Sequence, residues 1–166
     1  MKRVLLLGDS IRMGYQPMVT ELLQGKAEVT GPEDNCRFTL YTLWHVSQWV
    51  NAAGEVDLIH WNNGIWDLYT HLQDGSSIST PEEYGRNLRR ILKEIQALRP
   101  KARILFATTT PVAEGNGQIS NESIDCINAI AHEIMRDERI EVDDLNPALR
   151  GQAGLLCDDK LHLTEE

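Results

Sequence analysis

The sequence predicts an α/β domain, a three-layer α/β/α sandwich with a five-stranded parallel sheet. Short apolar runs alternate along the chain with longer stretches that carry apolar residues at helical spacing. The first run, Arg3–Leu7, has no polar alternation, which is typical of a strand that is buried on both faces. Strands separated by helices at this spacing pair in parallel through right-handed crossovers and carry helices on both faces of the sheet.

Each element has its own signal. Pro17 is expected to begin a short helix, since proline fits the first turn. A helix that follows Thr80 has a capping threonine, a proline in its first turn and an acidic residue three positions on, and it stops at Pro100. Gly31-Pro32 ends a strand, and Gly115-Asn116-Gly117 indicates a surface turn. The predicted strands are Arg3–Leu7, Ala27–Thr30, Val56–Trp61, Arg103–Ala107 and Ile140–Val142, and the predicted helices are Pro17–Leu23, Thr39–Ala52, Thr80–Leu98 and Ser120–Arg136.

This order of elements, followed by a loop that leads to Asp159, indicates one flavodoxin-like domain over residues 1–166, without a linker or repeat. A chain of 166 residues can bury roughly 70% of its unfolded surface. The apolar fraction of 42% and the charged fraction of 25% are ordinary for a globular protein. The net charge of −9 argues against nucleic acid or an anionic membrane as a partner.

Cysteines and the N-terminus bear on the cellular compartment. Cys36, Cys126 and Cys157 are odd in number and match no metal spacing, so we expect reduced thiols and no metal. The apolar run before Gly8 spans only about four residues, which is too short for a signal peptide. The expected location is therefore the cytoplasm.

Groups for nucleophilic catalysis stand at both ends of the chain. Gly8-Asp9-Ser10 follows the first predicted strand, at the edge where parallel sheets carry their sites, and Asp159-Lys160-Leu161-His162 lies near the other end. A serine hydroxyl becomes a nucleophile when an imidazole takes its proton and an acceptor orients that imidazole. Ser10 would otherwise serve as a helix cap, and either Asp158 or Asp159 has a carboxylate near His162. We expect ordinary surface or core roles for the other histidines, His45, His60, His71 and His132.

The two motifs resemble, in order and at the expected ends, the first and last blocks of the SGNH hydrolases, also called the GDSL esterase family. The resemblance implies Ser10 as nucleophile, His162 as general base and Asp159, three residues before the histidine, as the orienting carboxylate. It also implies that the Ser10 N–H faces the oxyanion and that no cofactor is required. Asp9 is expected to hydrogen-bond the turn as a structural residue.

The two middle blocks of the family are altered in this sequence. Asn35-Cys36-Arg37 matches the second block, with Arg37 in place of the glycine whose N–H donates to the oxyanion. Gly64-Ile65-Trp66-Asp67 matches the third block, with Trp66 in place of its asparagine. A variant third block of carbohydrate-esterase-like members resembles Asn62-x-Gly64-x-x-Asp67, so the amide donor is assigned to Asn62, with Asn63 second.

The resemblance implies a serine esterase that hydrolyses a small ester through an acyl-enzyme, with an acetyl or other short acyl group on a carbohydrate favoured. Trp61, Trp66 and Tyr69 cluster near the third block, where Trp66 could contact the substrate or the rings could belong to the core. Lysophospholipase or thioesterase activity, or a catalytically silent ligand-binding relative, are the alternatives. A flavin- or phosphate-binding module is disfavoured, because Gly8–Gly14 matches neither a dinucleotide nor a P-loop fingerprint.

The last residues have the composition of a helix start. Thr164-Glu165-Glu166 offers a cap and two acids, yet the sequence ends there, whereas members of the family usually continue into a final helix. We therefore expect this chain to lack that helix and to be less stable than an extended form, or to cover the exposed apolar face by self-association.

Overall fold

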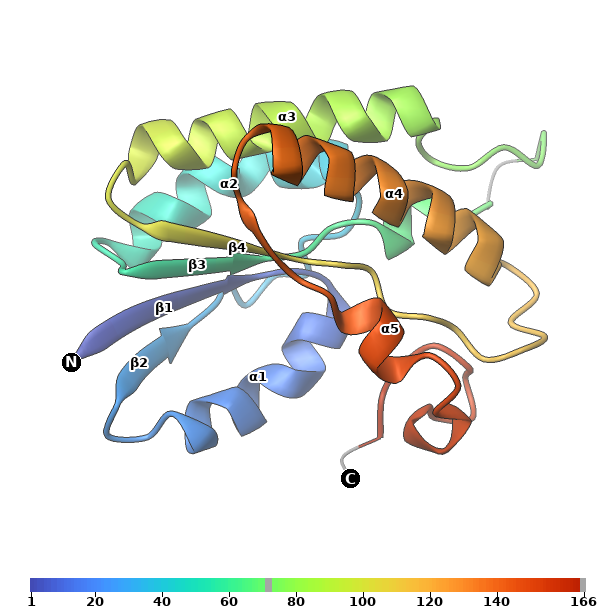
Figure 1. The fold of residues 1–166 in the computed structure, drawn as a ribbon, viewed down its shortest axis with the longest axis horizontal. Coiled ribbons are helices and arrows are strands. Elements are labelled where there is room, and N and C mark those ends of the chain that lie inside the picture. The colour runs from blue at the N-terminus through green and yellow to red at the C-terminus, as the bar shows by residue number, and fades with distance from the viewer. Residues whose placement is uncertain (71–72, 165–166) are drawn as a thin grey trace.

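The computed structural model describes residues 1–70 and 73–164, and it confirms the α/β sandwich. Figure 1 shows the sheet between two helical layers, with α2, α3 and α4 over one face and α1 and α5 under the other. The five strands pair in parallel, as predicted, and their order in the sheet is β2-β1-β3-β4-β5. The strands are β1 (Lys2–Leu7), β2 (Ala27–Thr30), β3 (Leu58–Trp61), β4 (Arg103–Ala107) and β5 (Glu141–Asp143). The helices are α1 (Ser10–Leu22), α2 (Thr39–Ala53), α3 (Pro81–Leu98), α4 (Asn121–Asp137) and α5 (Leu145–Leu149), with 3₁₀ helices η1 (Ile65–Leu68) and η2 (Ala153–Leu155).

The prediction for the first helix is wrong in its start. Helix α1 begins at Ser10, seven positions before the expected Pro17, and it ends at Leu22. Asp9 caps it, because its side chain accepts the N–H of Ile11 at 2.9 Å. Proline at position 17 lacks the N–H that would bond the preceding turn, but the helix continues through it. The cap therefore decides where the helix begins, and it puts Ser10 in the first turn.

The other boundaries shift by a few residues. Asp57 lies just before β3 and is bonded to β1, because its carboxylate accepts the N–H of Arg3 at 2.8 Å. Strand β5 extends to Asp143, whose carbonyl accepts the N–H of Thr108 at 3.0 Å. The segment after β5, expected to be a loop, contains α5 and η2, and η1 was not predicted either. Elements this short bury too few apolar residues to leave a periodic pattern in the sequence.

The main core lies between the sheet and α2, α3 and α4. Leu5 and Leu7 of β1 pack there with Ile59 and Trp61 of β3. A second, smaller core of Ile65, Val112, Ile119, Ile124 and Leu161 lies at the end of the sheet where the strands finish. In the described part of the chain, no helix is both long and apolar enough to cross a bilayer.

The capping box of α3 generates a stability prediction. Thr80 Oγ1 accepts the N–H of Glu83 at 3.2 Å, and the Glu83 carboxylate accepts the N–H of Thr80 at 2.9 Å. Thr80→Ala removes one side of this box, and we expect the free energy of unfolding in urea to fall by about 1 kcal/mol. Thr20→Ala is the control, because Thr20 lies near the end of α1 and its hydroxyl bonds only the Gln16 carbonyl. Equal losses in the two variants would contradict the capping role.

Candidate active site

The two ends of the chain meet at the edge of the sheet where the strands finish. Ser10 Oγ lies 2.8 Å from Nε2 of His162, although the two residues are 152 positions apart. His162 Nδ1 lies 2.6 Å from Oδ2 of Asp159. Asp158 is exposed, and the carboxylate on the imidazole is that of Asp159. The structure thus brings together the serine, histidine and carboxylate that the sequence singled out.

The turn that carries the histidine is held by its own carboxylate. Asp159 Oδ1 accepts the N–H of Leu161 at 3.0 Å and the N–H of His162 at 2.9 Å. Lys160 takes a left-handed conformation with φ of 65° to close the turn. These bonds, and foremost the one to the His162 ring, lower the pKa of Asp159 to about 2. The carboxylate therefore stays ionised and fixes the orientation of the imidazole.

Leu161 holds the same turn in place through its burial in the second core. It is buried in the second core with Ile65 and Val112, while His162 on the adjacent position remains half-exposed. Cys157, on the other side of the turn, bonds its end, because the N–H of Cys157 donates to the His162 carbonyl at 2.8 Å. The imidazole is thus carried by a packed turn and still faces solvent.

Ser10, the candidate nucleophile, lies at the positive end of α1. Ser10 is half-buried, and its N–H is among those that open the helix, where an anion is stabilised. Asp9 behaves as a structural residue in its contacts: it caps the helix and is only 1% exposed. Burial raises the pKa of Asp9, and its Oδ2 has no hydrogen-bond partner within the described residues.

The loop of the second block approaches the nucleophile from the side of β2. Cys36 is fully buried, its N–H donates to the Gly8 carbonyl at 3.1 Å, and its sulfur accepts the N–H of Gly8 at 3.3 Å. Arg37 has a φ of 50°, the left-handed region that the glycine of the family would occupy readily. Its N–H, however, donates to Oδ1 of Asn35 at 2.8 Å. This N–H can meet an oxyanion only after the Asn35 side chain rotates away.

Arg12 is a residue of this site that the sequence reasoning missed. It is 3% exposed, and it donates to the carbonyls of Pro32 and Asp34 at 3.0 Å each and, at a longer 3.4 Å, to that of Gly8. One buried guanidinium thus joins α1 to the second-block loop. Little in the sequence pointed to Arg12, because it lies in the first part of α1, before Pro17, which was not expected to be helical.

The structure separates the two candidate asparagines. Asn63 is fully buried, accepts the N–H of Trp61 at 2.7 Å, and donates to the Arg37 carbonyl at 2.9 Å and to Thr42 Oγ1 at 2.8 Å. Its amide is therefore fully engaged in holding the second-block loop. Asn62 is half-buried and donates one amide hydrogen to the Ala107 carbonyl at 2.8 Å, which leaves a second amide hydrogen.

The three aromatic residues of this region have different surroundings. Trp61 is fully buried in the core against Phe106, with ring centroids 5.0 Å apart. Trp66 and Tyr69 are half-buried at the rim of the second core, with centroids 5.5 Å apart. Trp66 is therefore accessible from the surface, whereas Trp61 is not.

Asp67, the last residue of the third block, joins three segments from inside. Its carboxylate accepts the N–H and the hydroxyl of Thr39 and the hydroxyl of Ser79, at 3.0, 2.6 and 2.6 Å. Burial raises the pKa of this carboxyl, whereas the hydrogen bonds act in the opposite direction. Its position beneath the loop is structural.

The other described histidines have partners other than Ser10, and His71 falls outside the described residues. His60 is buried, with Nε2 3.0 Å from Asp143 and Nδ1 3.4 Å from the Tyr15 hydroxyl, and His45 stacks on Trp49. Within residues 1–70 and 73–164 no group of three or more histidine, cysteine or acidic side chains could hold a metal ion. Cys36, Cys126 and Cys157 form no disulfide within the described residues.

Solved structures with a similar fold are esterases and lipases by their names. An acetyl xylan esterase has a TM-score of 0.80 and 17% identity, covering 98% of this chain and 91% of its own. An acetylxylan esterase from Geobacillus stearothermophilus has a TM-score of 0.79 and 18% identity, covering 98% and 87%. A GDSL-like lipase from Bacteroides thetaiotaomicron has a TM-score of 0.76 and 16% identity, covering 99% and 80%. No curated protein sequence matches the chain.

The family itself is identified by sequence. Residues 45–166 match the family described as GDSL-like lipase/acylhydrolase. This segment is more than half of the chain, and it holds the third block together with Asp159 and His162. The protein therefore belongs to the GDSL-like lipase/acylhydrolase family.

Proposed function

We propose that the protein is a serine ester hydrolase in which Ser10 is the nucleophile, His162 the general base and Asp159 the orienting carboxylate. The observation that carries this proposal is the unbroken line from Ser10 Oγ to His162 and on to Asp159, with 2.8 and 2.6 Å between the bonded atoms. Such an arrangement lets a neutral imidazole take the hydroxyl proton while the carboxylate stabilises the imidazolium that forms.

The reaction then proceeds in two halves. Ser10 Oγ attacks the ester carbonyl, its proton passes to Nε2 of His162, and a tetrahedral oxyanion forms. The intermediate collapses, the C–O bond to the alcohol breaks, and the alcohol leaves with the proton from Nε2. Water attacks the resulting acyl-serine with the same imidazole as base, which releases the carboxylic acid and restores Ser10.

The oxyanion needs donors that already point at it. The N–H of Ser10 at the start of α1 is the first, with the helix dipole behind it. The second amide hydrogen of Asn62 is the side-chain donor that we propose, since Asn63 is engaged elsewhere. The N–H of Arg37 is a third donor in a conformation where Asn35 has turned away.

For the substrate, we propose an acetyl or other short acyl ester of a carbohydrate. Support comes from the fold shared with structures named acetyl xylan esterases, at 17 and 18% identity. A lysophospholipase or thioesterase uses the same triad, so the acyl and alcohol preferences must be measured separately.

The N–H of Arg37, which is already bonded to Asn35, favours one other candidate, a catalytically silent ligand-binding relative. A burst of p-nitrophenol from p-nitrophenyl acetate that a serine-directed phosphonate abolishes would exclude the silent relative, and mass spectrometry should find the phosphonate on Ser10.

The triad is tested by substitution. Ser10→Ala is expected to lower kcat for p-nitrophenyl acetate by about 10⁴-fold or more without loss of the fold, because no other hydroxyl replaces the nucleophile. Asp159→Asn should cost less than His162→Ala, since the carboxylate only orients and stabilises. The exposed Ser76→Ala is the matched control and should be unchanged. Full activity in Ser10→Ala would end the proposal.

A pH profile tests the base independently. The imidazole must be neutral to accept the proton, so kcat/KM should rise with pH to a plateau as the base loses its proton. The pKa of Asp159 is lowered to about 2, so this carboxylate is already ionised throughout the assay range and adds no second step. A profile that is flat between about pH 5 and 9 would remove His162 as the base.

The two asparagines give contrasting predictions. Asn62→Ala should lower kcat by about 10²–10³-fold with little change in KM or in the unfolding free energy, because a donor to the transition state is lost. Asn63→Ala should instead reduce the unfolding free energy by about 2 kcal/mol or more, since buried partners of Asn63 lose their hydrogen bonds. Parallel kinetics and urea melts separate the two. A kcat defect in a fully stable Asn63→Ala would reverse the assignment.

A further inference from the structure

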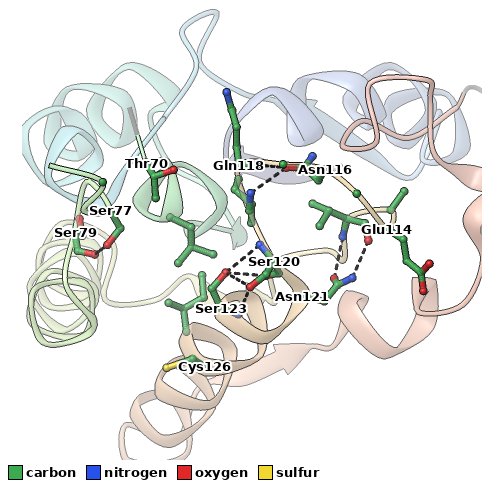
Figure 2. Close-up of a pocket in the computed structure, with 18 of the residues that line it drawn as sticks. Thr70, Ser77, Ser79, Glu114, Asn116, Gln118, Ser120, Asn121, Ser123 and Cys126 are labelled. Carbon is green, nitrogen blue, oxygen red and sulfur yellow. Dashed lines mark hydrogen bonds between the residues drawn. The ribbon is translucent and has the colours of Figure 1, made fainter. Parts of the chain in front are cut away.

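Two cavities of the structure differ sharply in size and lining. Figure 2 shows the larger one, of about 830 Å³, whose lining comes from residues within 68–81 and 112–127 and includes no residue of the triad. The smaller one, of about 10 Å³, is lined by Asp9 and Ile11, the two neighbours of Ser10 in the sequence, and we call it the inner cavity.

Two buried oxygen atoms that belong to the lining of the inner cavity have no hydrogen-bond partner within the described residues. One is Oδ2 of Asp9, a residue that is 1% exposed and whose other carboxyl oxygen caps α1 through the N–H of Ile11. The other is Oγ1 of Thr110, a residue that is 4% exposed. A buried polar atom without a hydrogen bond costs stability, so a partner is expected in the cavity that both residues line.

Five further polar side chains line the inner cavity, and each already has a partner in the protein. Arg12 donates to carbonyls of the second-block loop, and Thr108 Oγ1 donates to Oδ1 of Asp144 at 3.0 Å. The other three hydrogen bonds join Thr109 to the Asn63 carbonyl, Asn62 to the Ala107 carbonyl, and the Tyr15 hydroxyl to Nδ1 of His60. Among the described residues of this lining, the buried oxygens that lack a partner are therefore those of Asp9 and Thr110.

A single water molecule suits the inner cavity in size and in chemistry. It requires about 10–15 Å³ and about two to four polar partners, so a cavity of about 10 Å³ holds nothing larger. Water both donates and accepts, and it can therefore bond the Asp9 carboxyl in its ionised form or in the protonated form that burial favours by raising the pKa of Asp9. A metal cation suits the cavity less, because the guanidinium of Arg12 is part of the same lining.

The segment that carries Thr110 is firmly held. Asn128 bonds Thr109 on both sides, because it accepts the N–H of Thr109 and donates to its carbonyl, at 2.9 Å each. Asn146 donates to the same carbonyl at 2.8 Å. A molecule bonded to Thr110 is thus bonded to a part of the fold that both α4 and α5 hold in place.

We propose that one internal water molecule is bound between Oδ2 of Asp9 and Oγ1 of Thr110, and that Thr110 acts through it as a positioning residue for Ser10. Asp9 caps α1 and directly precedes Ser10, so a bond to its second oxygen holds the turn from which Ser10 faces His162. The water thereby joins the start of α1 to the segment that follows β4. The water site is independent of the reaction, whereas the positioning role rests on the proposed ester hydrolysis.

The water site is tested first on the unmodified protein. A crystal structure at a resolution that shows ordered solvent should contain one peak at about 2.5–3.0 Å from both oxygens, and Thr110→Val should lose it. In solution, magnetic relaxation dispersion of the water nuclei should detect fewer long-lived water molecules in Thr110→Val than in the unmodified protein. No peak between the two oxygens, an unchanged dispersion, or a peak with about six oxygen neighbours, as a metal cation has, would overturn the site.

The stability of Thr110→Val has opposite signs for a wet and a dry cavity. With water bound, valine leaves the water one hydrogen bond short, and the equilibrium constant for folding in urea melts should fall by about tenfold. In a dry cavity, valine replaces an unpaired hydroxyl by a methyl group, and the variant should be as stable as the unmodified protein or more stable. The second result would contradict the water site.

The positioning role is tested by kinetics on p-nitrophenyl acetate. Thr110→Val should lower kcat by about tenfold and change KM by less than about twofold, because a displaced Ser10 affects the chemical step rather than binding. Thr110→Ser is the matched control, since it keeps the hydroxyl but loses a buried methyl group, and its kcat should stay within about twofold. An unchanged kcat in Thr110→Val, or an equal loss in both variants, would overturn the positioning role.

The proposed function and the water site fail in different ways. If the unmodified protein does not hydrolyse p-nitrophenyl acetate, the proposed function is refuted and the positioning role with it, while the crystal structure and the urea melts still decide whether the water is bound. If the ester is hydrolysed and kcat does not depend on the Thr110 hydroxyl, the triad stands and the positioning role alone is refuted.

Discussion

The site depends on the pairing of β1 with β3. The two strands run in parallel with Leu7 opposite Trp61, so both finish at the same level of the sheet. Gly8 and Asn62 then leave the sheet side by side, and the N–H of Asn62 still donates to the Leu7 carbonyl at 2.9 Å. The backbone pairing of the two strands is thus enough to bring Gly8-Asp9-Ser10 and the third block together, without any contact between their side chains. Burial of Leu7 and Trp61 in the core fixes that register, since a shift would expose both.

Around the ends of β1 and β3, buried polar side chains bond backbone groups that apolar packing would leave without partners. Loops at the strand ends have unpaired N–H and C=O groups, which are costly unless they are bonded. Arg12 takes up carbonyls of the second-block loop, Asn63 bonds the carbonyl of Arg37, and Asp67 receives the N–H of Thr39. Each of these hydrogen bonds joins segments that are distant in the sequence, and each requires a particular orientation of its donor and acceptor. The conformation of the loops near Ser10 is therefore set by hydrogen bonds rather than by contact area.

The second core joins the turn that carries His162 to the segment that follows β4. Leu161 contributes to it from the histidine turn, while Val112 and Ile119 contribute from the segment between β4 and α4. The histidine turn and the segment that follows β4 are therefore built on one apolar support. In the altered second block, Arg37 keeps the left-handed backbone of a glycine, and the cation–π contact of its guanidinium with Tyr41, at 4.7 Å, keeps the side chain on the outer surface.

The sequence by itself determined the parallel sheet, and it singled out Ser10, Asp159 and His162, which the fold brings together. Apolar runs such as Val4–Leu7 and the capping box at Thr80 are local patterns, and a motif at each chain end can be read without knowing what surrounds it. The start of α1 was misread because a proline signal and a capping aspartate competed, and only the structure shows that the cap at Asp9 prevails. The distinction between Asn62 and Asn63, and the role of Arg12, depend on partners 20 to 46 positions away, which no local pattern encodes. The cavity lined by residues within 68–81 and 112–127 is likewise a product of tertiary structure, because its walls come from segments that are separate in the sequence.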